Sequence, residues 1–109
     1  MRIPKLAIDK EDKNLYYIYL FYVEEKWWAF GYSAYYLNIM YPKLEVIEIT
    51  SPEYGGNMPC VNVPNPFLVQ LSELYRTLAS DAYIQISTPP IVYCYRKEYD
   101  DWCMALTVN

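Results

Sequence analysis

The chain of 109 residues contains no histidine. Histidine is the commonest general base in enzymes, and its absence excludes Ser-His-Asp and Cys-His catalytic arrangements. The sequence also lacks a glycine-rich phosphate loop and a GxSxG motif. Two adjacent acidic pairs, Glu24-Glu25 and Asp100-Asp101, are typical of solvated turns rather than of a catalytic carboxylate pair, because neighbours on a strand point to opposite faces. We therefore expect a protein that is not an enzyme.

Cysteine is scarce as well: the chain has Cys60, Cys94 and Cys103 and no CxxC pair. An odd, small number of cysteines does not indicate a disulfide framework. Three thiolates without histidine lack the fourth ligand of a structural zinc site, so we expect no metal and no cofactor. Two alternatives stay open. Cys94 and Cys103 form a redox-sensitive pair across a hairpin, or Cys94, close to Arg96 and Lys97, is a reactive nucleophile.

Long apolar runs are absent. The longest, residues 15–23, has nine residues, whereas a helix needs about 20 to cross a bilayer. The first five residues are followed by charges at positions 9–12, not by the apolar core of a signal peptide. We therefore expect a cytoplasmic protein that does not act on membranes.

Basic residues are outnumbered, with 9 lysines and arginines against 13 acidic residues and a net charge of −4. The arginines Arg2, Arg76 and Arg96 are scattered along the chain. Binding to duplex nucleic acid depends largely on neutralising phosphates with a basic face. The charge pattern therefore disfavours duplex nucleic acid as a partner.

The length predicts a single domain, residues 1–109, with one core. We expect the α+β class: a small, mainly antiparallel or mixed β-sheet with about two helices packed on one face. Residues 9–14 suggest a charged turn and 51–64 a long loop. Asn65 and Pro66 predict the start of the second helix, and Ser33 caps the first. The expected strands are 5–8, 15–24, 27–32, 43–50, 83–88, 91–96 and 102–108, and the helices are 34–41 and 65–80.

The segment 15–24 is dense in aromatic and β-branched residues, which favour strands. Neither of its faces is polar, so we expect a central strand or one with a partner on one face. A turn at Glu25-Lys26 would return the chain antiparallel and place Val23 opposite Trp28 and Phe21 opposite Phe30.

The chain is rich in aromatic residues, with fourteen tyrosines and three tryptophans. Tyrosine and tryptophan supply large, rigid contact areas and dominate binding hot spots. We therefore expect a small binding protein, an inhibitor or adaptor of viral or mobile-element type, that binds a protein partner and forms a homo-oligomer. The predicted interface residues are Tyr17, Tyr19, Tyr22, Trp27, Trp28, Tyr32, Tyr35 and Tyr36.

An alternative hypothesis is a module that sequesters a nucleotide or another small molecule. Aromatic rings would stack on a base, while an arginine and the amino end of the helix at Pro66 would hold phosphate. The candidate ligand-binding residues of this alternative are Asn57, Asn65, Arg76 and Arg96.

Overall fold

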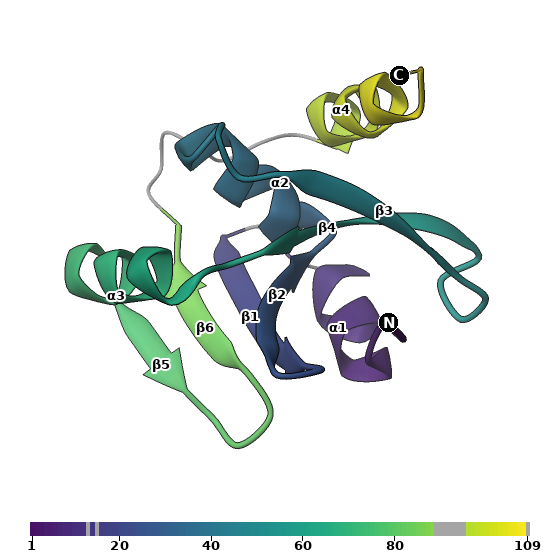
Figure 1. Ribbon diagram of the computed structural model, residues 1–109. Helices are drawn as coiled ribbons and strands as arrows, with labels where there is room; N and C mark the ends of the chain where they lie inside the picture. The colour runs from purple at the N-terminus through teal and green to yellow at the C-terminus, as the bar shows by residue number, and fades with distance from the viewer. Residues whose placement is uncertain (13, 15, 89–95, 109) are drawn as a thin grey trace.

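The structure, a computed structural model, describes residues 1–12, 14, 16–88 and 96–108 (Figure 1). Within these residues one sheet has six strands in the order β3-β4-β2-β1-β6-β5, and every neighbouring pair is antiparallel. The predicted α+β class is confirmed. The helices are α1 (Lys5–Asp12), α2 (Tyr32–Met40), α3 (Asn65–Leu74) and α4 (Arg96–Val108), and the strands are β1 (Tyr17–Val23), β2 (Lys26–Phe30), β3 (Val46–Ser51), β4 (Gly56–Asn62), β5 (Thr77–Ala79) and β6 (Ile84–Ser87).

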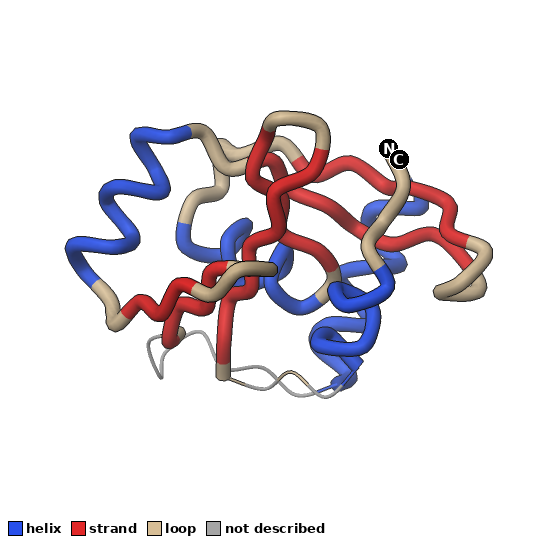
Figure 2. Tube along the Cα trace, turned by 90° about the horizontal axis from the view of Figure 1, so that it is seen from below, coloured by secondary structure: helices blue, strands red, loops and turns tan. Residues whose placement is uncertain are grey.

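The aromatic strand β1 lies inside the sheet, between β2 and β6, as its sequence predicts. Ile18 and Leu20 are fully buried on the face that α2 covers, in a core that also contains Tyr36, Leu37 and Leu71. Tyr19 and Phe21 are buried on the opposite face, where α1 completes a second core. The strands therefore run between helices on both sides (Figure 2).

The β1–β2 turn is at Glu24-Glu25, one residue earlier than predicted. Both glutamates have positive φ, 52° and 66°, as the two-residue turns of tight hairpins require. The expected register is therefore wrong: Val23 pairs with Lys26 and Phe21 pairs with Trp28. Because the pairing moves by two residues on the second strand, each side chain keeps its predicted face.

The predicted strand 5–8 and turn 9–14 are wrong, since α1 extends through most of both. The helix begins directly after Pro4, whose carbonyl accepts hydrogen bonds from the N–H groups of Ala7 and Ile8. Ala7 and Glu11, four residues apart, form its buried face. Of the charged residues that suggest a turn, Asp9 and Asp12 lie on the exposed face of this helix, whereas Glu11 is buried.

The predicted hairpin over 91–96 and 102–108 is also wrong. Residues 96–108 form α4, while 91–95 and Cys94 lie outside the described residues. Trp102, Met104, Leu106 and Val108 alternate as in a strand, but Tyr99, Trp102, Cys103 and Leu106 have helical spacing. Tyr99, Trp102 and Cys103 pack on the core beneath α2, whereas Met104 is exposed. The segment therefore follows its helical spacing and forms a helix instead of a strand.

The long loop predicted over 51–64 contains β4, which pairs with β3 on one side and β2 on the other. Pro59 argues against a central strand because it has no N–H to donate. Its carbonyl points toward Gly31 and accepts the Gly31 N–H at 3.0 Å, just where β2 has ended. In an antiparallel strand the nitrogen and the carbonyl of one residue point to the same side, so the Pro59 nitrogen also faces the space beyond the end of β2. The missing N–H of Pro59 therefore costs the sheet no ladder hydrogen bond.

The two predicted helices are confirmed, with shifted ends. Helix α2 starts at Tyr32 after Gly31, and Ser33 lies inside its first turn rather than capping it. Helix α3 has Pro66 in its first turn, but it ends at Leu74 instead of continuing to 80. Residues 77–79 instead pair with β6, so Leu78 is exposed on a strand rather than joining the apolar stripe of α3, and Leu74, the last residue of α3, is exposed as well.

A matched pair of substitutions on β1 compares a buried tyrosine with an exposed one on the same strand. Tyr19 is 8% exposed, and its ring meets that of Tyr83 edge-on at 5.5 Å, whereas Tyr22 is 59% exposed. Tyr19→Ser should lower the free energy of unfolding by about 3 kcal/mol, and Tyr22→Ser by no more than about 0.5 kcal/mol. Urea denaturation of both variants measures the difference, and equal losses would contradict the burial of Tyr19 and the exposure of Tyr22.

Candidate functional site

The predicted interface residues fall into three groups. Tyr19, Tyr32 and Tyr36 are buried at 8%, 7% and 0% exposure. They belong to the two cores: Tyr32 stacks on Tyr99 with ring centres 3.9 Å apart, which joins α2 to α4. These three rings are therefore unavailable to a partner of the folded protein.

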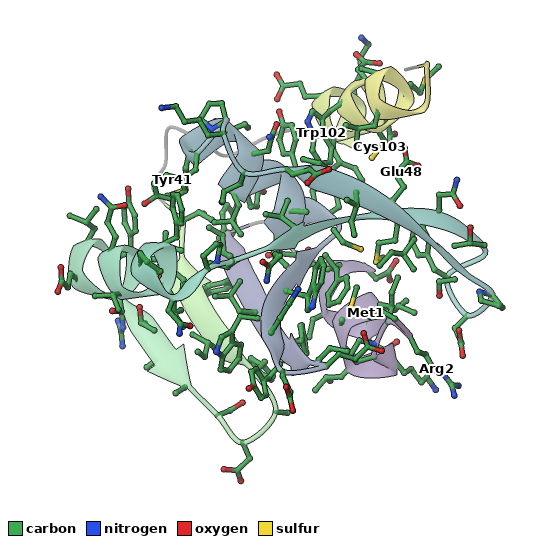
Figure 3. All side chains as sticks on the ribbon, in the orientation of Figure 1. Met1, Arg2, Tyr41, Glu48, Trp102 and Cys103 are labelled. Atoms are coloured by element: carbon green, nitrogen blue, oxygen red, sulfur yellow. The ribbon has the colours of Figure 1, made fainter. Side chains whose placement is uncertain are left out.

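Tyr17, Trp28 and Tyr35 are half-buried, each at the margin of a core. Tyr35 is held edge-on against Trp102 at 5.1 Å, and α4 presents Trp102 and Cys103 toward the sheet (Figure 3). The indole Nε1 of Trp28 is buried and has no hydrogen-bond partner among the described residues. These rings contribute mainly to the attachment of α1 and α4.

Tyr22 and Trp27 remain accessible, and they lie next to each other across the β1–β2 hairpin. Their ring centres are 5.1 Å apart with the planes tilted by 46°. Tyr22 is exposed, whereas Trp27 is half-buried against the core under α2. Together they form one side of a groove of about 440 Å³, which Glu25, Lys26 and residues 62–65 complete. We name this the tip groove.

Two local features build the tip groove. The Trp27 carbonyl accepts the Val63 N–H at 2.9 Å and the Asn62 side-chain amide at 3.1 Å, which fixes the end of β4 beside the start of β2. Pro64 then turns the chain into α3. The left-handed turn at Glu24-Glu25 pairs Tyr22 with Trp27 across the hairpin, at a cost of about 1–2 kcal/mol for each non-glycine residue.

The candidate ligand-binding residues do not converge. Asn65 lines the tip groove, but Arg76 follows the other end of α3, and a ten-residue helix is about 15 Å long. Asn57 is on β4, where its side-chain oxygen accepts a hydrogen bond from Thr50 at 2.7 Å. The side chain of Arg96 lies outside the described set. The described candidates thus do not form a common phosphate site.

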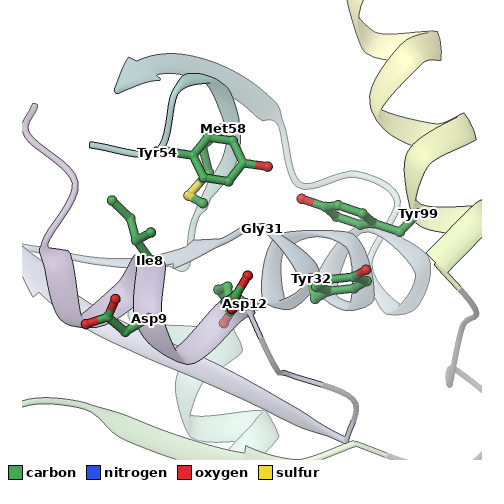
Figure 4. Close-up of a pocket in the computed structure, with 9 residues that line it drawn as sticks. Ile8, Asp9, Asp12, Gly31, Tyr32, Tyr54, Met58 and Tyr99 are labelled. Carbon is green, nitrogen blue, oxygen red and sulfur yellow. The ribbon is translucent and has the colours of Figure 1, made fainter. Parts of the chain in front are cut away.

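A second, smaller cavity of about 210 Å³ is enclosed by α1, the start of α2, the β3–β4 hairpin and α4 (Figure 4). Tyr54 and Tyr99 approach it from opposite sides, and Asp9, Glu11 and Asp12 line it from α1. Among the described residues no group of three or more acidic, histidine or cysteine side chains is arranged to hold a metal ion. The acidic residues here are therefore not a metal centre.

Glu11 is only 3% exposed, and its carboxylate holds α1 against the first turn of α2. It accepts hydrogen bonds from the Ser33 N–H at 2.9 Å, the Ser33 hydroxyl at 2.6 Å and the Asn14 amide at 3.1 Å. The Ser33 oxygen in turn accepts the Tyr19 N–H at 2.8 Å. One buried carboxyl thus connects α1, α2 and β1. Sequence patterns did not indicate this role, because Glu11 belongs to a charged stretch.

Burial raises the pKa of Glu11 from its ordinary value of 4.5 to about 7, although the hydrogen bonds from Ser33 and Asn14 lower it in part. A buried negative charge loses its hydration, and this loss outweighs the hydrogen bonds. The carboxyl therefore changes protonation close to neutral pH.

Cys60 is not an activated thiol. Cys60 is buried in the core under α1, and burial raises the pKa of its thiol to about 12. A thiol with a raised pKa is a poor nucleophile at neutral pH. Cys103 is half-buried on α4 and lines a hollow with Glu48 and Met104. The predicted Cys94–Cys103 pair involves a residue outside the described part of the chain.

Comparison with protein-family models, with curated proteins and with solved structures finds no match. None of the described helices is long and apolar enough to cross a bilayer. The fold defines the class as a small α+β protein, and its function has to be argued from the tip groove and the Glu11 contact alone.

Titration of Glu11 predicts a pH-dependent stability. Between pH 4.5 and about 7 the folded protein keeps a proton on Glu11 that the unfolded chain releases. The free energy of unfolding should therefore fall as pH rises through this window, by about 3 kcal/mol in total. Glu11→Gln, which cannot titrate, should remove this slope. Urea denaturation at several pH values tests it, and parallel pH profiles for the two proteins would contradict it.

Gly31 should be needed for the same contact. It has φ 58° and ψ −126°, and a Cβ there would approach the Glu11 Cβ to 3.2 Å. Gly31→Ala should lower the free energy of unfolding by at least about 2 kcal/mol, from backbone strain and the displacement of Glu11. Gly56→Ala is the control, because its added Cβ meets no atom within 4 Å. Thermal or urea unfolding of both variants measures these losses, and equal losses of unfolding free energy would contradict the close contact between Gly31 and Glu11.

Proposed function

We propose that the protein is a small binding protein, an inhibitor or adaptor, that captures a protein partner through the tip groove. The carrying observation is the Tyr22–Trp27 pair, with an exposed phenol ring against a half-buried indole at the edge of a groove of about 440 Å³. Aromatic rings in this setting, half anchored in the core and half exposed, are typical of binding hot spots.

The backbone beside the groove supports this proposal. Glu24 and Glu25 occupy left-handed conformations that glycine or asparagine would adopt at lower cost. Strain of this kind persists where the surrounding structure enforces it, and it is concentrated at functional sites. The strained turn and the aromatic pair are adjacent, so one functional surface accounts for both.

The charge of the groove favours a protein partner over a nucleotide. Lys26 is accompanied by Glu25 in the lining and by Glu24 at the turn, so the groove has no excess of positive charge for phosphate. Arg76 lies at the far end of α3. The nucleotide alternative therefore gains no support from the described residues, and we propose a non-enzymatic, phosphate-independent role.

Site-specific photo-crosslinking tests the proposal. p-Benzoylphenylalanine replaces Tyr22 or, as a matched control, Tyr16, which is 50% exposed at the other end of β1. Irradiation in cells that naturally make the protein should give a discrete adduct from position 22 and none from position 16. Added wild-type protein should compete for the adduct, whereas the Tyr22→Ala variant should not.

The mass of the adduct identifies the type of partner. A mass of two copies of the chain would make the partner a second protomer, and size-exclusion chromatography with light scattering would then show a dimer that Tyr22→Ala dissociates. Any other discrete mass would indicate a different protein. Equal labelling from positions 22 and 16, or no adduct from position 22, would reject the tip groove as the interface.

A further inference from the structure

The walls of the tip groove differ in chemistry. The Tyr22 and Trp27 rings, tilted by 46°, form an aromatic wall on the β1–β2 hairpin. Val63 and Pro64, on the link to α3, also line the groove, and Asn62 and Asn65 contribute amide groups. Asn62 donates one of its two side-chain N–H groups to the Trp27 carbonyl, and no described residue accepts the other. The groove thus combines flat apolar surfaces with side-chain donors.

The position of the groove in the sheet excludes one common mode of peptide recognition. An extended peptide that adds to a sheet needs an open strand edge. Here β1 lies between β2 and β6, and β2 lies between β1 and β4, while β3 and β5 are the edge strands of the described sheet. A partner at the tip groove must therefore be recognised through side chains rather than through strand pairing.

The lining also argues against a helix as the bound element. An amphipathic helix needs a continuous apolar groove for a stripe of its side chains. Half of the residues that line the tip groove are polar or charged: Glu25, Lys26, Asn62 and Asn65. A polyproline II segment fits this mixture better, because its proline rings pack on aromatic rings while its unpaired backbone carbonyls accept hydrogen bonds from side-chain donors.

The charges at one end of the groove indicate what flanks such a segment. The carboxylates of Glu24 and Glu25 are exposed at the turn beside the Tyr22 ring, and they outnumber Lys26. The whole chain also carries a net charge of −4. A guanidinium or ammonium group would gain both from the carboxylates and from the face of the exposed ring.

We propose that the tip groove binds an extended, proline-containing segment of the partner with a basic residue at one end. This inference rests on the proposed function and adds the chemical class of the partner. The prolines lie between the Tyr22–Trp27 pair and Pro64, and the basic residue lies at Glu25. Because polyproline II is extended before binding, the segment loses little conformational entropy on binding.

Fluorescence anisotropy with labelled synthetic peptides tests the inference. The parent peptide carries two Pro-Leu-Ala-Pro units followed by two arginines; one control replaces the prolines by alanine and the other replaces the arginines by glutamate. The parent should bind saturably, and each control at least about ten-fold more weakly, as expected for the loss of a main anchor. Equal binding of the parent and the alanine control would overturn the proline part, and equal binding of the glutamate control would overturn the basic part.

Three variants localise the binding. Tyr22→Ala should weaken binding of the parent peptide at least about ten-fold, while Tyr16→Ala, at a similarly exposed ring, should leave it unchanged. Glu25→Gln should weaken the parent peptide but not a version with neutral glutamines in place of the arginines. Circular dichroism verifies that each variant is folded.

The two proposals can fail separately. Absence of saturable binding of the parent peptide up to millimolar concentration overturns the inference, as does equal weakening by Tyr16→Ala. If position 22 still gives a specific crosslink, the proposed function survives and only the proline-rich class of partner is rejected. If the crosslink also fails, both proposals are rejected.

Discussion

The central strand β1 has apolar side chains on both faces, and most of the architecture follows from covering them. Ile18 and Leu20 need one layer of helices, and Tyr19 and Phe21 need another. A chain of this length has few residues for two layers, so α1, a short and highly charged helix, serves as the cover of the second face. Tyr22, near the end of the strand, lies on the same face as Ile18 and Leu20 but is exposed, and the tip groove forms beside it.

Using a charged helix as a cover places Glu11 inside the protein, and the structure accommodates it with three hydrogen bonds from Ser33 and Asn14. Desolvation still outweighs these bonds and raises the pKa of the carboxyl to about 7. Gly31 permits the close approach, since its backbone conformation and the contact with Glu11 both exclude a side chain. The attachment of α1 is therefore specific in geometry but sensitive to pH near neutrality.

The sequence predicted what depends on local patterns. The two faces of β1, the antiparallel return into β2, the strands β3 and β6, and the presence of α2 and α3 all follow from alternation, proline and turn residues, although the β1–β2 register and the helix ends differ from the prediction. Sequence-based prediction failed where a contact between residues far apart in the chain determines the secondary structure. Pro59 fits in β4 only because β2 ends at Gly31, and the alternation at 102–108 is overridden by the contacts of Tyr99 and Trp102 with α2. Of the predicted interface, only Tyr22 and Trp27 meet in the tip groove, because the abundance of tyrosines cannot show which rings form the cores.

The tip groove and the Glu11 contact lie at different places along β1, and the residues of the two places meet different physical requirements. Tyr19, close to Ser33, is buried and joined to the α1–α2 network, whereas Tyr22, three residues on, is exposed beside a strained turn. A protein selected for stability alone would favour glycine or asparagine at Glu24 and Glu25 and a smaller polar residue at Tyr22. Those two departures occur together at the tip of one hairpin, and the first of them supplies two carboxylates. Their coincidence is best explained by a partner that contacts the Tyr22 ring and the two carboxylates together. A basic, proline-containing segment satisfies both requirements.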